Sequence, residues 1–247
     1  DRLSKVIRYK DVKNWILVPK YYDPELEKIL DKLRNEGYEL VSIGQLVKDK
    51  VLDIETGVEV GKLAYGTGDI PFVRTSDITN WEIKTDPKHS VSWDIYEFWR
   101  EKAPKKTDIK VGDILLVRDG TYLVGSTAII RDVDIHSDDD PRLLIQAEIF
   151  RIRVLRKDVL SPYLLLALLN TDVVKRQIRN YQFTRGVIDT LGDRIYEIVL
   201  PIPKNEAKRV EIEKKVQEII EQRAKYWKAM RDLPPTIIPY RLDTSVR

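Results

Sequence analysis

Two stretches in which an apolar strand runs directly into a polar cluster constrain the fold most strongly. The first is Gly68–Asn80, where Ile70, Phe72 and Val73 form a β-prone core followed by a run of short hydrogen-bonding side chains. A buried strand cannot satisfy so many polar groups, so the strand must end and present them at a surface. The same order recurs at Gly112–Tyr122. Two such units predict a rigid scaffold that displays loops for recognition.

The composition supports a folded protein and excludes several kinds of chemistry. The 247 residues fit one large domain or one domain with an appendage, and a hydrophobic share of 43% is enough for a core. A net charge of +3, from 43 Lys+Arg against 40 Asp+Glu, is too balanced to indicate nucleic acid by itself. The lack of cysteine excludes disulfides, thiolate zinc sites and cysteine nucleophiles. With no signal peptide and no apolar run long enough for a bilayer, we expect a cytoplasmic protein without a membrane partner.

Local patterns predict an α+β fold. Helices are expected after Asp23-Pro24, after Ser161-Pro162 and over Val173–Asn180, because each is preceded by a capping side chain. The expected strands are Glu39–Ile43, Ile70–Arg74, Ile114–Val117, Tyr122–Ile130, Leu143–Leu155 and Ile195–Leu200. Residues 48–69 are expected to form a long loop or hairpin, Asp119-Gly120 a tight turn, and Gln182–Gly186 a polar loop.

Apolar residues at alternating four- and three-residue steps predict one long coiled-coil-type helix over 205–233. Arg223 occupies the one polar position of this stripe, whose proposed oligomer or partner contacts are Ile212, Val216, Ile219, Tyr226 and Met230. We therefore divide the chain into a lead-in and helix (1–36), a globular domain (37–204), the long helix (205–233) and a tail (234–247).

An ordered set of motifs precedes the long helix: Gly37-Tyr-Glu-Leu-Val-Ser-Ile-Gly44, Ile70–Asp77, Gly112–Gly120, Ser161-Pro-Tyr-Leu164, Thr190-Leu-Gly192 and Leu200-Pro-Ile-Pro203. In these motifs and their order, the chain resembles one half of a type I restriction-modification specificity subunit. The resemblance implies a target-recognition domain with a mixed or antiparallel twisted sheet and flanking helices, which reads part of a double-stranded DNA sequence. It also implies that the helix is a spacer. A complete subunit has two of each part, so this half is expected to dimerise through its helix, to pair with a second half-subunit, or to be a fragment of a longer chain.

The resemblance further implies a methyltransferase partner that uses S-adenosylmethionine, with a restriction and translocation subunit as a further candidate partner. No cofactor is expected in this chain itself. The segment before Gly37, with Tyr21-Tyr-Asp-Pro24, resembles the linker that follows a methylase domain in fused modification enzymes. A C-terminal specificity part of a fused methylase-restriction enzyme is therefore an alternative.

Candidate DNA contacts are the polar residues at the strand ends and in the basic segments, because cations hold phosphates and polar side chains read base edges. They are Arg74, Thr75, Ser76, Asp77, Asn80, Lys105, Lys106, Arg118, Thr121, Tyr122, Arg179, Gln182, Thr184 and Arg185, with Lys175 and Arg176 as further phosphate candidates. Each has a structural alternative. Arg74 and Arg118 can pair with Asp77 and Asp119, the hydroxyls can cap turns, Tyr122 can point into the core, and lone cations are usually solvated.

The sequence contains no catalytic motif that would make the chain an enzyme. A methyltransferase needs a glycine-rich cofactor loop and an Asn/Asp-Pro-Pro-aromatic motif, and neither occurs. The alternative is a metal-dependent nuclease using Asp77, Glu82 and Lys84, whose order resembles the acid-acid-lysine spacing of restriction nucleases. Such a triplet arises readily by chance in a sequence rich in Glu and Lys, where it forms an exposed strand face.

Overall fold

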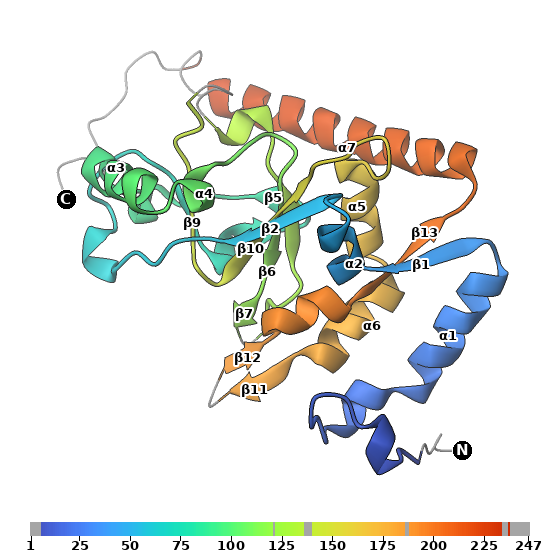
Figure 1. Ribbon diagram of the computed structural model, residues 1–247. Helices are drawn as coiled ribbons and strands as arrows, with labels where there is room; N and C mark the ends of the chain where they lie inside the picture. Colours follow the sequence, from blue (N-terminus) through green and yellow to red (C-terminus); the bar gives the residue numbers. More distant parts are fainter. Residues whose placement is uncertain (1–5, 121, 136–139, 186–187, 234–236, 238–247) are drawn as a thin grey trace.

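The structure is a computed structural model that describes residues 6–120, 122–135, 140–185, 188–233 and 237 (Figure 1). It has the expected α+β fold: small, mostly antiparallel sheets, flanking helices and one long C-terminal helix. Among the described residues, no helix has the length and apolarity needed to cross a membrane.

The centre of the domain is a four-stranded antiparallel sheet in the order β2-β10-β6-β8. Its strands are β2 (Leu52–Thr56), β6 (Ile114–Val117), β8 (Thr127–Ile129) and β10 (Ile149–Val154). Both faces are buried, since Ile114 and Leu116 pack in one apolar cluster and Leu115 and Val117 in another. An all-apolar strand such as β6 is what a doubly covered sheet requires.

Helices cover the face of this sheet that carries Ile114 and Leu116. They include α2 (Ile43–Lys48), α5 (Pro162–Leu169) and α6 (Asp172–Tyr181). The N-caps are those expected: Ser161 Oγ accepts from Leu164 N, and Asp23 accepts from the first turn of α1 (Pro24–Asn35). The adjoining ribbon pairs β1 (Tyr38–Ser42) with β13 (Val199–Pro203) antiparallel. Gly37 ends α1 with a positive φ of 88°, a conformation that glycine adopts without strain.

Four short pairings complete the domain. Strand β3 (Phe72–Val73) runs parallel to β9 (Leu144–Ile145), and β4 (Ile78–Thr79) forms a hairpin with β5 (Glu82–Ile83). A three-stranded sheet has the order β11-β12-β7, made of β11 (Phe183–Arg185), β12 (Ile188–Thr190) and β7 (Asp119–Gly120). Helices α3 (Trp93–Lys102) and α4 (Pro104–Thr107) lie toward the left of Figure 1.

Helix α7 (Glu206–Asp232) begins at the Asn205 cap and lies along the top of Figure 1, against α5. Val216, Ile220 and Ala224 are its buried residues. The β7, β11 and β12 strands lie at the bottom of the same view, so the long helix and the three-stranded sheet are on opposite sides of the domain.

Several predicted element boundaries are wrong. Strand β2 lies inside the segment expected to form a long loop or hairpin, because it pairs with β10 over five residue pairs despite its polar sequence. Asp119-Gly120 forms β7 instead of a turn, and the turn before β8 lies around Gly125. The expected continuous strand Leu143–Leu155 is broken between β9 and β10. The expected loop Gln182–Gly186 contains strand β11. Ile195 belongs to a 3₁₀ turn, so the last strand begins only at Val199.

Candidate nucleic-acid interface

One shallow cavity of about 450 Å³ brings together two of the three segments expected to display polar groups, whereas the third, Gln182–Gly186, does not line it. Its lining comes from four separate parts of the chain: Thr75, then Arg118, Asp119 and Gly120, then Gln146 and Glu148, and finally Ile188 and Thr190. Because β7 and β12 form one wall, the cavity lies on the side of the domain away from α7 (Figure 1).

The first wall is the turn that follows β3. The polar run after Val73 folds into a 3₁₀ turn at Thr75–Asp77. The backbone N–H of Thr75 donates to Gln146 Oε1 (3.1 Å), and Gln146 N–H donates to the carbonyl of Val73 (2.9 Å). These bonds fix the turn against the β9–β10 connection, as the parallel β3–β9 pairing predicts.

Arg118 is held in a defined orientation at the end of β6. Its Nε and Nη2 lie 2.7 and 2.6 Å from Asp119 Oδ2, and the guanidinium lies 5.6 Å from the centre of the Phe150 ring. Thr190 donates its hydroxyl hydrogen to the other oxygen of Asp119. The ion pair considered from the sequence is therefore present, and it orients the arginine without covering it, since about a third of the side chain remains exposed.

The β11–β12 hairpin forms the opposite wall and is braced by polar contacts. Thr184 Oγ1 donates to Asp189 (2.7 Å), and Gln182 Nε2 lies 3.3 Å from the same carboxylate. Arg194 stacks on the Phe183 ring at 4.2 Å and donates to the carbonyls of Tyr181 and Thr190. The hairpin is thereby tied to the end of α6.

The other residues of the first polar run point elsewhere. The Arg74 guanidinium donates to His89 Nε2 (2.7 Å) and lies over the Tyr65 ring, while Asp77 accepts from the backbone N–H of Arg74 (2.8 Å). Burial raises the pKa of Asp77 despite that hydrogen bond. Asn80 lies in the β4–β5 turn, where its carbonyl accepts from Arg223 of α7 (2.7 Å). Ser76 is exposed beside Asp77.

The basic candidates are of two kinds. Lys105 and Arg179 are exposed, whereas Lys106, Lys175 and Arg176 bind other groups of the protein. Lys106 donates to Thr56 and Gly57, next to the Gln146 backbone, and Lys105 is exposed on the same short helix. Arg179 is exposed on α6, and burial together with Arg179 lowers the pKa of Lys175, which donates to the carbonyl of Gly125. Arg176 instead binds Asp23 and Glu25 and so joins α6 to α1.

Two candidates remain beyond a structural test. Thr121 lies outside the described residues, and only the backbone of Arg185 is described, as part of β11. Tyr122 is almost fully exposed, which excludes the alternative that it points into the core.

The residues of the nuclease alternative are used in structural contacts. Glu82 binds Arg131 through one oxygen (2.7 Å) and Arg223 through the other (2.8 Å). Asp77 caps the turn before β4, and Lys84 is exposed. Within the described ranges, no group of three or more carboxylate or imidazole side chains is arranged to hold a metal ion.

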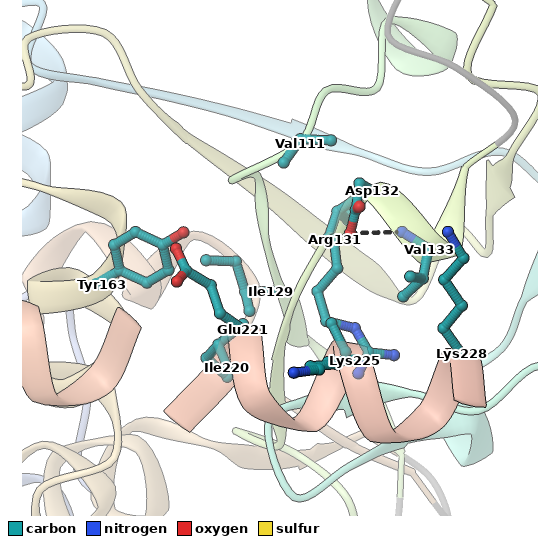
Figure 2. A pocket seen from close by; sticks show the side chains of 12 residues that line it. Val111, Ile129, Arg131, Asp132, Val133, Tyr163, Ile220, Glu221, Lys225 and Lys228 are labelled. Atoms are coloured by element: carbon teal, nitrogen blue, oxygen red, sulfur yellow. Dashed lines mark hydrogen bonds between the residues drawn. The ribbon is translucent and has the colours of Figure 1, made fainter. Parts of the chain in front are cut away.

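A second cavity of about 450 Å³ lies where α7 crosses the domain (Figure 2). Tyr163 and Ile129 of the domain face Ile220 and Glu221 of the helix, and Lys225 and Lys228 line its far end. The buried Arg131 beside it pairs with Asp134 (2.8 Å) and Glu82. This cavity is part of the contact between the helix and the domain.

Of the residues that line the first cavity, only Thr75 and Arg118 were among the expected contacts, and the missed ones include Gln146 and Glu148. Both lie in the turn between β9 and β10, inside the segment expected to be one continuous strand. The polar interruption Gln146-Ala-Glu148 in an otherwise apolar run was the signal that could have located this turn. The role of Arg194 had no comparable local signal.

Comparison with known proteins finds solved structures of a similar shape. No protein-family model matches the chain, and no curated protein matches it in sequence. The type I restriction-modification S subunit from M. genitalium is 12% identical, with 74% of this chain and 39% of that chain covered and a TM-score of 0.49. The HsdS subunit from Thermoanaerobacter tengcongensis is 16% identical, with 86% and 47% covered and a TM-score of 0.42.

A third solved structure, the type IIG restriction endonuclease BpuSI, is 10% identical, with 80% of this chain and 28% of that chain covered and a TM-score of 0.51. The chain spans less than half the length of each of these three proteins. The likeness to BpuSI shows that the chain shares the fold of a part of a restriction endonuclease.

Proposed function

We propose that this chain is the sequence-specific, double-stranded DNA recognition unit of a restriction-modification system. The observation that carries the proposal is the convergence of polar side chains from four separate segments on one cavity, on the side of the domain away from α7. An oriented arginine, hydroxyl groups and a carboxylate surround this cavity. These are the groups that read base edges.

In this proposal the chain performs no catalysis and directs a partner methyltransferase to its target in the cytoplasm. The methyltransferase would bind S-adenosylmethionine, and an endonuclease is a further candidate partner. The similarity of the fold to parts of restriction-modification proteins supports this assignment. The engagement of Glu82 by two arginines disfavours the nuclease alternative, because a metal would have to displace both.

The proposal also includes self-association, or pairing with a second half-subunit, through α7. Ile219, Tyr226 and Met230 are exposed along one flank of this helix, together with Leu233. Ile212 and Val216 instead pack on the domain, so they contribute to the seating of the helix. A symmetric pair would recognise a palindromic target divided by a fixed spacer.

Selection from a library of random DNA duplexes tests the recognition function. We expect the whole chain to enrich a defined sequence, and we expect its affinity to fall steeply between low and moderate salt, because phosphate contacts release counterions. Failure to enrich any sequence, or an affinity that does not depend on salt, contradicts the proposal.

A second candidate is the specificity part of a fused methylase-restriction enzyme. The likeness to a 28% portion of BpuSI favours it, as does the docking of the Tyr21–Asp23 segment on α6 through Arg176 and Tyr181. The two candidates share the DNA-reading role and differ in whether the methylase is on the same polypeptide. The gene sequence upstream of Asp1 separates them: an in-frame methylase region supports the fused form, and a separate methyltransferase gene contradicts it.

A further inference from the structure

We infer that the cavity lined by Arg118 and Glu148 reads a G·C base pair in the major groove, with Arg118 binding guanine and Glu148 accepting a hydrogen bond from the cytosine amino group. This inference rests on the proposed DNA-reading function and adds the class of base pair and the residues that select it. Glu148 was not among the contacts expected from the sequence.

Arg118 presents the edge of its guanidinium that guanine requires. Asp119 engages one edge, formed by Nε and Nη2. The end of the fork, formed by Nη1 and the second hydrogen of Nη2, has no further partner in the described part of the chain and can form a bidentate contact. The pattern of acceptors that matches this end is O6 and N7 of guanine.

Glu148 lies directly beside this arginine. Val117 pairs with Ile149 in the β6–β10 register, and Arg118 N–H donates to the carbonyl of Glu148 (2.8 Å). Arg118 and Glu148 follow and precede these paired residues, and both line the same cavity.

The carboxylate of Glu148 lacks a donor. Its Oε2 is buried and makes no hydrogen bond within the described part of the chain. The other such atoms in the described ranges belong to Arg74, His89, Glu97 and Arg151, none of which lines this cavity. A buried acceptor without a donor is destabilising, so a ligand that donates here gains affinity, and turning this oxygen toward the opening breaks no hydrogen bond.

The surrounding groups favour G·C over A·T. A glutamate accepts from the N4 amino group of cytosine, whereas adenine is usually read by a bidentate amide. The amide side chain in this cavity is Gln146, and its oxygen already accepts from Thr75 N–H. An arginine donor beside a glutamate acceptor reproduces the complement of a G·C pair, which presents O6 and N7 next to N4–H.

The test compares the base preferences of four forms of the whole chain in the random-duplex selection: wild type, Glu148→Ala, Arg118→Lys and Glu101→Ala. Glu101 is an exposed residue of α3, so its variant matches the charge change of Glu148→Ala away from the cavity. We expect the wild type to require G·C at one position. Preference for that pair should fall about 5- to 150-fold in Glu148→Ala and in Arg118→Lys, with little change at other positions or in Glu101→Ala.

Two modified duplexes locate the contact within the groove. Replacing the guanine at that position by 7-deazaguanine removes the N7 acceptor and should weaken binding about 10-fold. Replacing it by hypoxanthine removes only the minor-groove amino group and should leave affinity unchanged. Glu148→Gln, which keeps the side-chain shape, is measured beside Glu148→Ala and should also lose cytosine preference.

The outcomes separate this inference from the function on which it rests. If the wild type enriches a sequence but neither cavity variant changes a G·C position, or if the Glu148-dependent position is A·T, the inference is wrong and the recognition function stands. Sensitivity to hypoxanthine instead of 7-deazaguanine also overturns it. If the wild type enriches no sequence, the proposed function itself fails.

Discussion

Asp23 connects the start of α1 to α6 through five hydrogen bonds. Its carboxylate accepts from Glu25 N–H and Leu26 N–H, from Arg176 Nε (2.6 Å) and Nη2 (3.1 Å), and from Asn180 Nδ2 (2.9 Å). Burial alone would raise the pKa of this group, but the hydrogen bonds from Arg176 and Asn180 outweigh burial, and the pKa is lowered.

We expect Asp23→Asn to reduce the free energy of unfolding by about 1–2 kcal/mol at pH 7, because the charge-assisted bonds weaken. A lowered folded-state pKa means that the stabilisation is complete above the unfolded pKa of about 4 and is lost as the pH falls through the folded value. Urea unfolding from pH 7 to pH 2.5 should therefore show the two proteins converging in acid. Asp31→Asn, at an exposed pair with Arg34, should cost only a few tenths of a kcal/mol, and a difference that stays constant with pH contradicts the assignment.

The sequence identified Arg118 but could not distinguish it from Arg74. Both follow an apolar strand and precede an aspartate by one or three residues, yet one lies in the cavity and the other binds His89, which is fifteen positions away. Partners at that distance depend on how the chain folds back on itself. Local patterns therefore found candidate residues, while tertiary contacts decided which of them share a site.

At the scale of elements, two adjacent isoleucines on α7 have different roles: one packs against the domain, and the other lies on the surface proposed for pairing. Ile220 is 3% exposed against α5 and the sheet, and Ile219 is 47% exposed. We expect Ile220→Ala to lower the free energy of unfolding by about 2–5 kcal/mol, since it leaves a cavity in the core.

Ile219→Ala is the matched control for folding and the test variant for pairing. It should change the stability of the monomer by less than about 1 kcal/mol, because its side chain is already half in water. In the proposed dimer it should weaken self-association, measured by sedimentation equilibrium. If Ile219→Ala and Ile220→Ala destabilise the monomer equally, then the flank of α7 that carries Ile219, Tyr226 and Met230 is not a free surface.

Gly57 controls how closely β2 approaches the turn that carries the cavity. A Cβ at this position would collide with the carbonyl oxygens of Ile145 and Gln146. We expect Gly57→Ala to cost about 1–3 kcal/mol of stability and to displace Gln146, so that DNA selectivity falls with it. Gly61→Ala, where the added carbon meets nothing nearby, should leave both the unfolding midpoint and the selected sequence unchanged.

Capped helices were the elements that the sequence predicted best. Asp23 and Ser161 each cap the helix that they were expected to begin, and the predicted helix over Val173–Asn180 is capped by Thr171, because these signals lie within a few residues of one another. The short strands β7, β11 and β12 could not be predicted, because each has few residues and depends on partners distant in the chain. The cavity is built largely from such strands.

At the scale of the whole molecule, the nuclease alternative makes a direct prediction. With plasmid DNA and magnesium the whole chain should produce no cleavage, because Glu82 is engaged by Arg131 and Arg223 at the contact between α7 and the domain. Gel electrophoresis beside a magnesium-dependent nuclease provides the control. Cleavage that disappears in Glu82→Gln would establish the rival function.

The cavity side chains lie at the ends of strands whose apolar residues form the core. Thr75, Arg118, Gln146 and Glu148 are only partly buried, whereas Val73, Val117, Ile145 and Ile149 beside them are fully buried. In the proposed DNA-reading role, substitutions at the first set change which bases are preferred at little cost in folding stability. In that role, a lineage carrying this fold acquires new DNA targets by successive single replacements while its scaffold stays intact.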